Sequence, residues 1–169
     1  MLSLLGARPS ALTEAPPSDD DWYLNLLWIE RRKCLPLTHV RTLFPIFVAD
    51  VRKADVTPIG QYVTALIKEE LRSKSFAPNT LDPLDPGDVQ LARTQSRSVL
   101  AVMNNTALLV RYQVAAMGGI DYAYATVVNH FLRRTPHQRE GGWITPDDLV
   151  GTEALRPRHR GLTAPALRT

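Results

Sequence analysis

Three stretches of the chain repeat apolar side chains at the spacing of an amphipathic helix. The first is segment 55–76, where Thr57 is the expected cap and Pro58 the expected first helical residue. The second runs from Ser96 to about Met117 and ends at a glycine pair, and the third is segment 121–134. The apolar repeats of the first and third stretches are Ile59, Tyr62, Val63, Leu66 and Ile67, and Ala125, Val128, Phe131 and Leu132.

Other segments are predicted to be strands. Segment 22–30 is aromatic and apolar enough for a mostly buried strand, 31–33 is a charged turn, and 33–38 returns as the second strand of a hairpin. Short strands are also expected at 1–5 and 89–94, and 143–150 is expected to close the domain as a strand or a helical turn. Segment 39–49 suits a short helix kinked at Pro45.

This order of elements predicts one α+β domain over residues 1–150. The domain combines a small mixed or antiparallel sheet of about four strands with about four helices. The remaining segment, 151–169, holds four arginines against one glutamate, a net of +3 that equals the formal charge of all 169 residues. Its proline and arginine content predicts a disordered basic tail.

The composition narrows the class of protein. Hydrophobic residues make up 44% of the chain, which is typical of a globular domain, and no apolar run reaches the ~20 residues of a membrane span. The single cysteine, Cys34, cannot form an intramolecular disulfide and suits a reducing compartment, so we expect a cytoplasmic protein. Cys34 lies beside a leucine on a predicted strand and reads as a small buried hydrophobe.

Arg97 is the most informative charged residue, because it sits at a helix start where positive charge is disfavoured by ~0.3–1 kcal/mol. Ser96 is the expected cap, and Ser98 offers a second hydroxyl. Two interpretations stay open. A carboxylate of this chain (Asp21, Glu30, Asp147 or Asp148) neutralises Arg97, or a phosphate or carboxylate ligand binds Arg97, the two hydroxyls and the free amides.

Further candidate ligand-binding residues lie in the hairpin and the long helix. Arg31 and Arg32 flank the predicted turn, and one of them approaching the helix start would build a two-arginine anion site. Alternatively, both stay solvated and discourage edge pairing. Asn25 is expected to pin neighbouring backbone and Asn104 follows one turn after Leu100. Trp22 and Trp28 read as core aromatics, with a base-stacking platform as the alternative.

No catalytic or metal motif is complete. The histidines, His39, His130, His137 and His159, show no ligand spacing with cysteine or carboxylates, so we expect no metal and no cofactor. The glycines lack the strand–loop–helix context of a phosphate-binding loop.

The stretches "DWYLNLLWIERRKCLPLTHVRTLF" and "TQSRSVLAVMNN" resemble an uncharacterised bacterial family catalogued only as a domain of unknown function (6933 type), over about residues 15–150. The resemblance supports the fold boundaries and the choice of residues, and it implies no reaction. The matching residues are Asp21, Trp22, Asn25, Leu26, Leu27, Arg31, Arg32, Lys33, Cys34, Leu35, Thr38, Ser96, Arg97, Ser98, Val99, Leu100, Met103 and Asn104, with "FLRRTP" at 131–136 as a looser match.

The leading hypothesis is therefore a non-enzymatic interaction or regulatory module that binds a protein partner or an anionic ligand. Two alternatives stay open. The first is a nucleic-acid-binding protein of a mobile-element or toxin–antitoxin type system, which would use the basic tail for phosphate contacts. The second is an enzyme acting on a phosphorylated substrate, for which the sequence assigns no general base.

Overall fold

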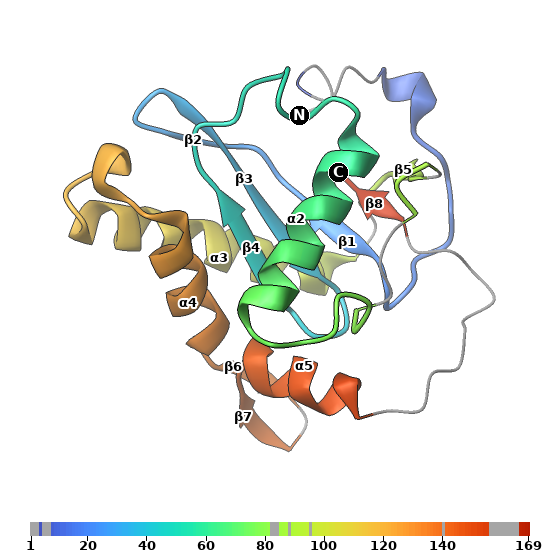
Figure 1. The fold of residues 1–169 in the computed structure, drawn as a ribbon. Helices are drawn as coiled ribbons and strands as arrows, with labels where there is room; N and C mark the ends of the chain where they lie inside the picture. The colour runs from blue at the N-terminus through green and yellow to red at the C-terminus, as the bar shows by residue number, and fades with distance from the viewer. Residues whose placement is uncertain are drawn as a thin grey trace.

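A computed structural model describes residues 4, 8–81, 85–87, 89–94, 96–139, 141–155 and 166–169. The described residues form the α+β fold that the sequence predicts, with four α-helices, a six-stranded mixed sheet and a separate two-stranded hairpin (Figure 1). In chain order the elements are η1 Pro9–Ala11, β1 Trp22–Leu24, β2 Leu27–Ile29, β3 Arg32–His39, β4 Pro45–Val48, α2 Ile59–Ser73, β5 Leu91–Ala92, α3 Arg97–Ala116, η2 Ile120–Tyr122, α4 Ala125–Arg134, β6 His137–Arg139, β7 Gly142–Ile144, α5 Pro146–Ala154 and β8 Leu167–Arg168.

Strand β3 is the centre of the large sheet. It pairs antiparallel with β4 along one edge and with both β1 and β2 along the other. Beyond β1 the sheet continues through β8 to β5, and both of these pairings are parallel. The predicted hairpin is therefore confirmed as β2–β3, although the strand expected over 22–30 is broken at Asn25 and Leu26.

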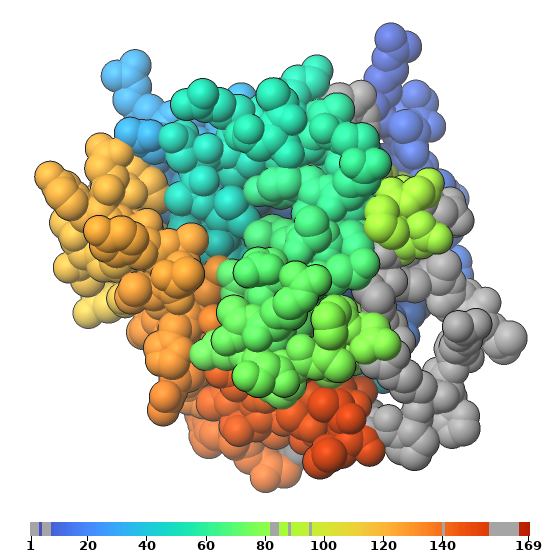
Figure 2. All heavy atoms as spheres, viewed as in Figure 1, coloured from blue at the N-terminus to red at the C-terminus, as the bar shows by residue number. Residues whose placement is uncertain are grey.

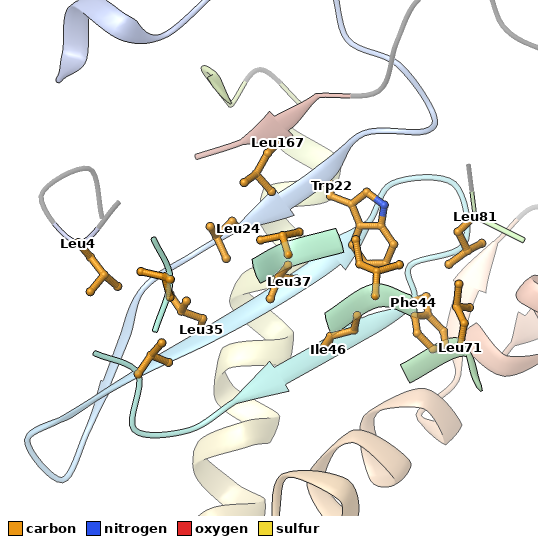
Figure 3. Close-up of a cluster of buried hydrophobic side chains, with 14 of the residues drawn as sticks. Leu4, Trp22, Leu24, Leu35, Leu37, Phe44, Ile46, Leu71, Leu81 and Leu167 are labelled. Atoms are coloured by element: carbon orange, nitrogen blue, oxygen red, sulfur yellow. The ribbon is translucent and has the colours of Figure 1, made fainter. Parts of the chain in front are cut away.

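Side chains alternate between the two faces of this sheet. Trp22, Leu24, Leu35, Leu37 and Ile46 point to the side covered by α2, where they pack with buried residues of that helix (Figure 3). Figure 2 shows α2 lying across this side of the molecule, with α5 below it. Tyr23, Cys34 and Phe47 point to the opposite side and pack against α3 and α4. The sheet is thus the middle of three layers.

Two helices begin and end close to where the sequence predicts. Helix α2 buries Val63, Ile67 and Leu71, and its N-cap is Pro58 rather than the expected Thr57. Helix α3 ends before Gly118 and Gly119, whose φ angles of 92° and 112° suit glycine. The amide of Gly119 donates to the carbonyl of Val114 at 3.0 Å, which closes the helix end. No helix among the described residues is long and apolar enough to cross a membrane.

The prediction of a helix over 39–49 is wrong, because residues Pro45–Val48 form strand β4. The run "LFPIFVA" is apolar on both sides, so it lacks the alternation that distinguishes a strand from a buried helix. The side chain of Asn129 binds this edge strand as another strand would. Its Oδ1 accepts from the Phe47 amide at 2.6 Å and its Nδ2 donates to the Phe47 carbonyl at 3.3 Å.

The hairpin turn also differs from the prediction. Its two residues are Glu30 and Arg31, with φ angles of 47° and 67°, whereas Arg32 already belongs to β3. Positive φ at both central positions gives the backbone the twist that a two-residue hairpin needs. Trp28, expected in the core, is 53% exposed and lies under the Lys33 ammonium, whose nitrogen is 5.5 Å from the ring centroid.

The C-terminal segment is not a disordered tail where the structure describes it. Helix α5 extends to Ala154, and β8 lies inside the sheet between β1 and β5. Arg168, one of the four arginines of the predicted tail, is 0% exposed. It forms an ion pair with Asp21, which is also buried. Residues 156–165, which carry the other three arginines, and most of the strand expected at 1–5 lie outside the described residues; of the latter only Leu4 is described, and it is buried.

Candidate functional site

The start of α3 has the local structure that the sequence predicts. Ser96 is the N-cap, with its hydroxyl accepting from the Val99 amide at 3.4 Å. The hydroxyls of Ser96 and Ser98 are 2.9 Å apart and share a hydrogen bond. The Ser96 amide in turn donates to the Tyr23 hydroxyl at 3.3 Å, which fixes the helix start against the sheet. Among the described residues, the amides of Arg97 and Ser98 have no acceptor and face outward from the helix end.

A cavity of about 400 Å³ opens beside this helix start. Apolar side chains of the strand-connecting segment and of α3 form one part of its wall, and polar side chains form the rest. The lining residues are Asp19, Val40, Arg41, Leu43, Ser96, Ser98, Val99, Val102, Gln138 and Arg139. The "α3-start cavity" therefore contains both predicted serines but not Arg97.

The charges around the α3-start cavity are mixed. Arg41 forms ion pairs with Asp20 and with Glu153, whose Oε2 lies 3.1 Å from the guanidinium, so its charge is already neutralised. Arg139 donates to the carbonyl of Arg41 at 3.0 Å and has no carboxylate partner among the described residues. Asp19 adds a negative charge to the wall. An anion in this cavity would rely on Arg139, the two serine hydroxyls and the Ser98 amide.

Arg97 itself is exposed, and within the described part of the chain it has no hydrogen bond or ion pair. The four carboxylates expected to neutralise it are all engaged elsewhere. Asp21 pairs with Arg168, Glu30 accepts from the Ile120 amide, Asp147 lies 3.9 Å from both Lys74 and Arg133, and Asp148 completes a capping box with Thr145. Among the described residues, no carboxylate of this chain therefore neutralises Arg97.

The hairpin arginines lie at the other end of α3. Glu30 at the hairpin tip accepts from the Ile120 amide at 3.0 Å, just beyond the last turn of the helix. Arg32 contacts Asp50 at 2.7 Å and Asp121 at 2.5 Å, and Arg31 is exposed. A helix of 20 residues is about 30 Å long. The structure thus does not bring Arg31 or Arg32 to Ser96, and the two-arginine site expected there does not form.

The two candidate asparagines are also separated from the α3-start cavity. Asn25 occupies the break between β1 and β2, where its Oδ1 accepts from the Leu26 amide at 2.8 Å and its own amide donates to the Pro36 carbonyl at 3.0 Å. It therefore holds backbone, as expected from the sequence. Asn104 is exposed on α3, on the side away from the sheet.

That side of α3 is the feature that sequence reasoning missed. The helix buries Val99, Met103, Thr106, Val110 and Val114, which form one face toward the sheet. Its opposite side, here called the outer face, consists of Arg97, Ala101, Asn104, Asn105, Leu108, Tyr112 and Ala115, all of them exposed. Leu108 is 65% exposed and Tyr112 is 69% exposed. The signal was present in the sequence, because segment 97–116 carries apolar residues well outside its buried face.

The exposed apolar surface continues past the helix end. Tyr122 and Tyr124, in the connection to α4, are as exposed as Tyr112, and Leu100 flanks the outer face near its start. Helix α3 has only two charged residues, Arg97 and Arg111, and both are cationic. A large exposed apolar surface of this kind, crossed by few charges, is typical of a surface that contacts another molecule.

The buried titratable groups provide no reactive arrangement among the described residues. Burial lowers the pKa of His39 to about 3, and its Nδ1 lies 2.9 Å from the Thr42 hydroxyl. Burial also raises the pKa of the Cys34 thiol, which is 0% exposed, so Cys34 is the buried hydrophobe that the sequence predicts. No group of three or more His, Cys, Asp or Glu side chains in the described ranges is placed to hold a metal ion.

Comparison with known proteins assigns no activity. The family model described as "Domain of unknown function (DUF6933)" matches residues 1–149. No curated protein matches the sequence.

Proposed function

The chain belongs to the DUF6933 family, a domain of unknown function, and we propose from its geometry that it is a non-enzymatic interaction module. Its contact surface is the outer face of α3 together with the tyrosines that follow the helix. The observation that carries this proposal is the alignment of Leu108 and Tyr112 on one helix face that no other described residue covers and on which Arg97 is the one charged residue.

The physical reason is the free energy of apolar surface in water. Burying apolar area stabilises by roughly 25 cal/mol per Å², so a helix that leaves its largest apolar side chains in solvent forgoes that stabilisation in the isolated chain. Single exposed leucines are common and need no explanation. Here the exposed side chains lie on the same face over several turns, which supports an interface that is completed by association.

The chemistry at the α3-start cavity supports a binding role rather than catalysis. Its two hydroxyls hydrogen-bond to each other and to the helix end, and Arg41 is held by two carboxylates. A hydroxyl nucleophile needs a general base within hydrogen-bond distance. Neither Ser96 nor Ser98 has a histidine or carboxylate partner within the described residues.

Site-specific photo-crosslinking tests this function. A benzophenone amino acid replaces Leu108 in the full chain, expressed in its native cell, and the matched control carries it at Gln61, an exposed position on α2. We expect a discrete covalent adduct from position 108 and none from position 61, because only the outer face of α3 contacts a partner. Absence of any adduct at position 108 would contradict the function.

A second candidate is the binding of a small anionic ligand in the α3-start cavity. The specific observation in its favour is that Arg139 and the hydroxyls of Ser96 and Ser98 line one cavity at a helix start, where an anion is stabilised. Titration of the full chain with inorganic phosphate should then perturb the Ser98 and Val99 amide signals, and Arg139→Gln should weaken binding at least about threefold. Phosphate binding that is unchanged by Arg139→Gln, or no binding, rules this site out.

The setting that we propose for either role is the cytoplasm of a bacterium. The support is the single cysteine, which is a buried free thiol and can form no intramolecular disulfide. A nucleic-acid partner is less well supported, since Arg32 and Arg168 are already paired with carboxylates.

A further inference from the structure

We propose that the outer face of α3 pairs antiparallel with the same face of a second copy of this chain. This inference rests on the proposed function, that the outer face is a contact surface, and it names the partner. Two independent observations carry it: the charge that α3 leaves unneutralised at its start, and the order of large and small residues along its outer face.

Arg97 places a positive charge at the start of α3. The start of a helix is the positive end of its macrodipole and the end is negative, so a cation is favoured only at the C-terminal end. Arg97 has no carboxylate partner among the described residues. In an antiparallel pair it lies beside the C-terminal end of the partner's α3, where carbonyl groups point outward. Asp121 is at the same end and its side chain is 66% exposed, so it can accept from a second guanidinium.

A parallel pair would be unfavourable for the same reason. It would place two Arg97 side chains side by side, with no acidic residue on either helix. Like charges at contact destabilise an interface and can exclude an arrangement. The antiparallel gain is modest, because Arg31 at the hairpin tip also lies near the C-terminal end of α3.

The order of side chains fits this orientation. Ala101, Leu108 and Ala115 follow one another at seven-residue intervals, the repeat of residues that face a partner helix in a coiled coil. With Leu108 near the two-fold axis, the two leucines meet and each Ala101 lies opposite the partner's Ala115. Small residues at both ends let the helix backbones approach closely. Asn104 then lies opposite the partner's Tyr112, which places an amide beside a phenol hydroxyl.

The size of the face indicates a weak dimer. A 20-residue helix about 30 Å long and about 10 Å wide offers roughly 300 Å² in projection, less than the about 800 Å² per partner of a standard interface. Tyr122 and Tyr124 add area at each end. We therefore expect dissociation in the micromolar range, so that the dimer forms only at sufficient concentration.

Disulfide trapping of the full chain tests the arrangement, because the natural Cys34 is buried and does not interfere. Leu108→Cys should form a covalent dimer under mild oxidation at least about tenfold faster than the matched control Gln61→Cys, since position 108 lies near the two-fold axis and position 61 lies on α2. Equal rates for the two variants, or failure of both to cross-link, would overturn the proposal.

Sedimentation equilibrium gives a second readout without introduced cysteines. The wild-type chain should approach twice its monomer mass as its concentration rises, and Leu108→Glu should stay monomeric with an unchanged circular-dichroism spectrum. Arg97→Glu should weaken the dimer about tenfold, whereas Arg134→Glu, an exposed cation on α4, should not. A wild-type chain that stays monomeric at about 1 mM would overturn the proposal.

The photo-crosslink at position 108 separates this inference from the function on which it rests. An adduct of twice the chain mass supports both. An adduct of any other mass supports the interaction module and contradicts the proposed dimer.

Discussion

His39 shows how burial changes the chemistry of one residue. It is 1% exposed, its ring lies 5.0 Å from that of Trp22, and its Nε2 has no partner among the described residues. Because the surroundings cannot solvate a charged imidazolium, the pKa of His39 falls from 6.5 to about 3. The neutral ring is therefore part of the folded core over the whole physiological range of pH.

This shift predicts a pH-dependent stability. The unfolded chain binds a proton at His39 below pH 6.5, and the folded chain does so only near pH 3. The stabilising difference is fully present above pH 6.5 and is lost as the pH falls from 6.5 toward 3, by up to about 1.4 kcal/mol per pH unit. Urea unfolding at several pH values between 7.5 and 5 should show this slope. His39→Gln should reduce it to the smaller slope of the remaining groups, among them His137, whose pKa burial also lowers.

The exposed Gln61, which carries no titratable group, provides the control for this prediction. Gln61→Ala should keep the wild-type slope. A His39→Gln variant whose stability depends on pH as steeply as that of the wild type would show that His39 titrates normally in the folded chain.

At the scale of elements, strand β8 depends on a contact that links the two ends of the chain. The guanidinium of Arg168 forms an ion pair with Asp21 and donates to backbone carbonyls of Arg93 at 2.9 Å, Ala15 at 3.0 Å and Pro16 at 2.6 Å. Asp21 also accepts from the Ala166 and Ser18 amides, both at 2.8 Å. Every polar group of this buried pair is therefore satisfied, which is the condition for keeping two charges out of water.

Breaking the pair should be costly. Asp21→Asn leaves the Arg168 charge buried without a counter-charge, and we expect the free energy of unfolding in urea to fall by about 3–5 kcal/mol. The control is Arg72→Gln, which removes the exposed pair between Arg72 and Glu69 and should cost less than about 1 kcal/mol. If Asp21→Asn were as stable as the wild type, residues 166–169 would be a free tail after all.

The elements that could be predicted from the sequence are those defined by local rules. The amphipathic repeat of α2, the serine cap of α3 and its terminal glycines all act within a few residues, and the structure has them where the pattern placed them. Strand β8 could not be predicted, because two residues form a strand there only by pairing with the distant β1 and β5, and the ion pair that holds them joins Arg168 to Asp21, 147 positions away. Strand β4 was mistaken for a helix because both of its faces are apolar.

The candidate site was likewise predictable only for residues whose positions follow from local rules. Ser96 and Ser98 were found because capping is local, and both line the α3-start cavity. That Arg97 has no carboxylate partner among the described residues was not predictable, because the folded chain engages each of the four candidate carboxylates elsewhere. The hairpin arginines were misplaced because the hairpin docks at the far end of α3.

On the scale of the whole molecule, the two helix layers differ in the side chains that they expose to solvent. Helix α2 covers one side of the sheet and turns Gln61, Glu69 and Arg72 toward solvent, as expected for the outside of a monomer. Helix α3 covers the other side and turns Leu108 and Tyr112 outward. Both sides of the sheet are buried, and of these two helices only α3 has large apolar side chains that are exposed. The outer face of α3 is therefore the surface that we propose as a two-fold interface between copies of this chain.

Distances between nitroxide labels in the associated chain test that claim most directly. Labels are placed one at a time at positions 101, 108 and 115 of otherwise wild-type chains. In an antiparallel pair with Leu108 near the axis, labels at 108 are close together, whereas labels at 101, and likewise at 115, are offset by about 21 Å along the helix, from 1.5 Å per residue. Equal separations at all three positions, or no intermolecular coupling at any of them, would contradict the account.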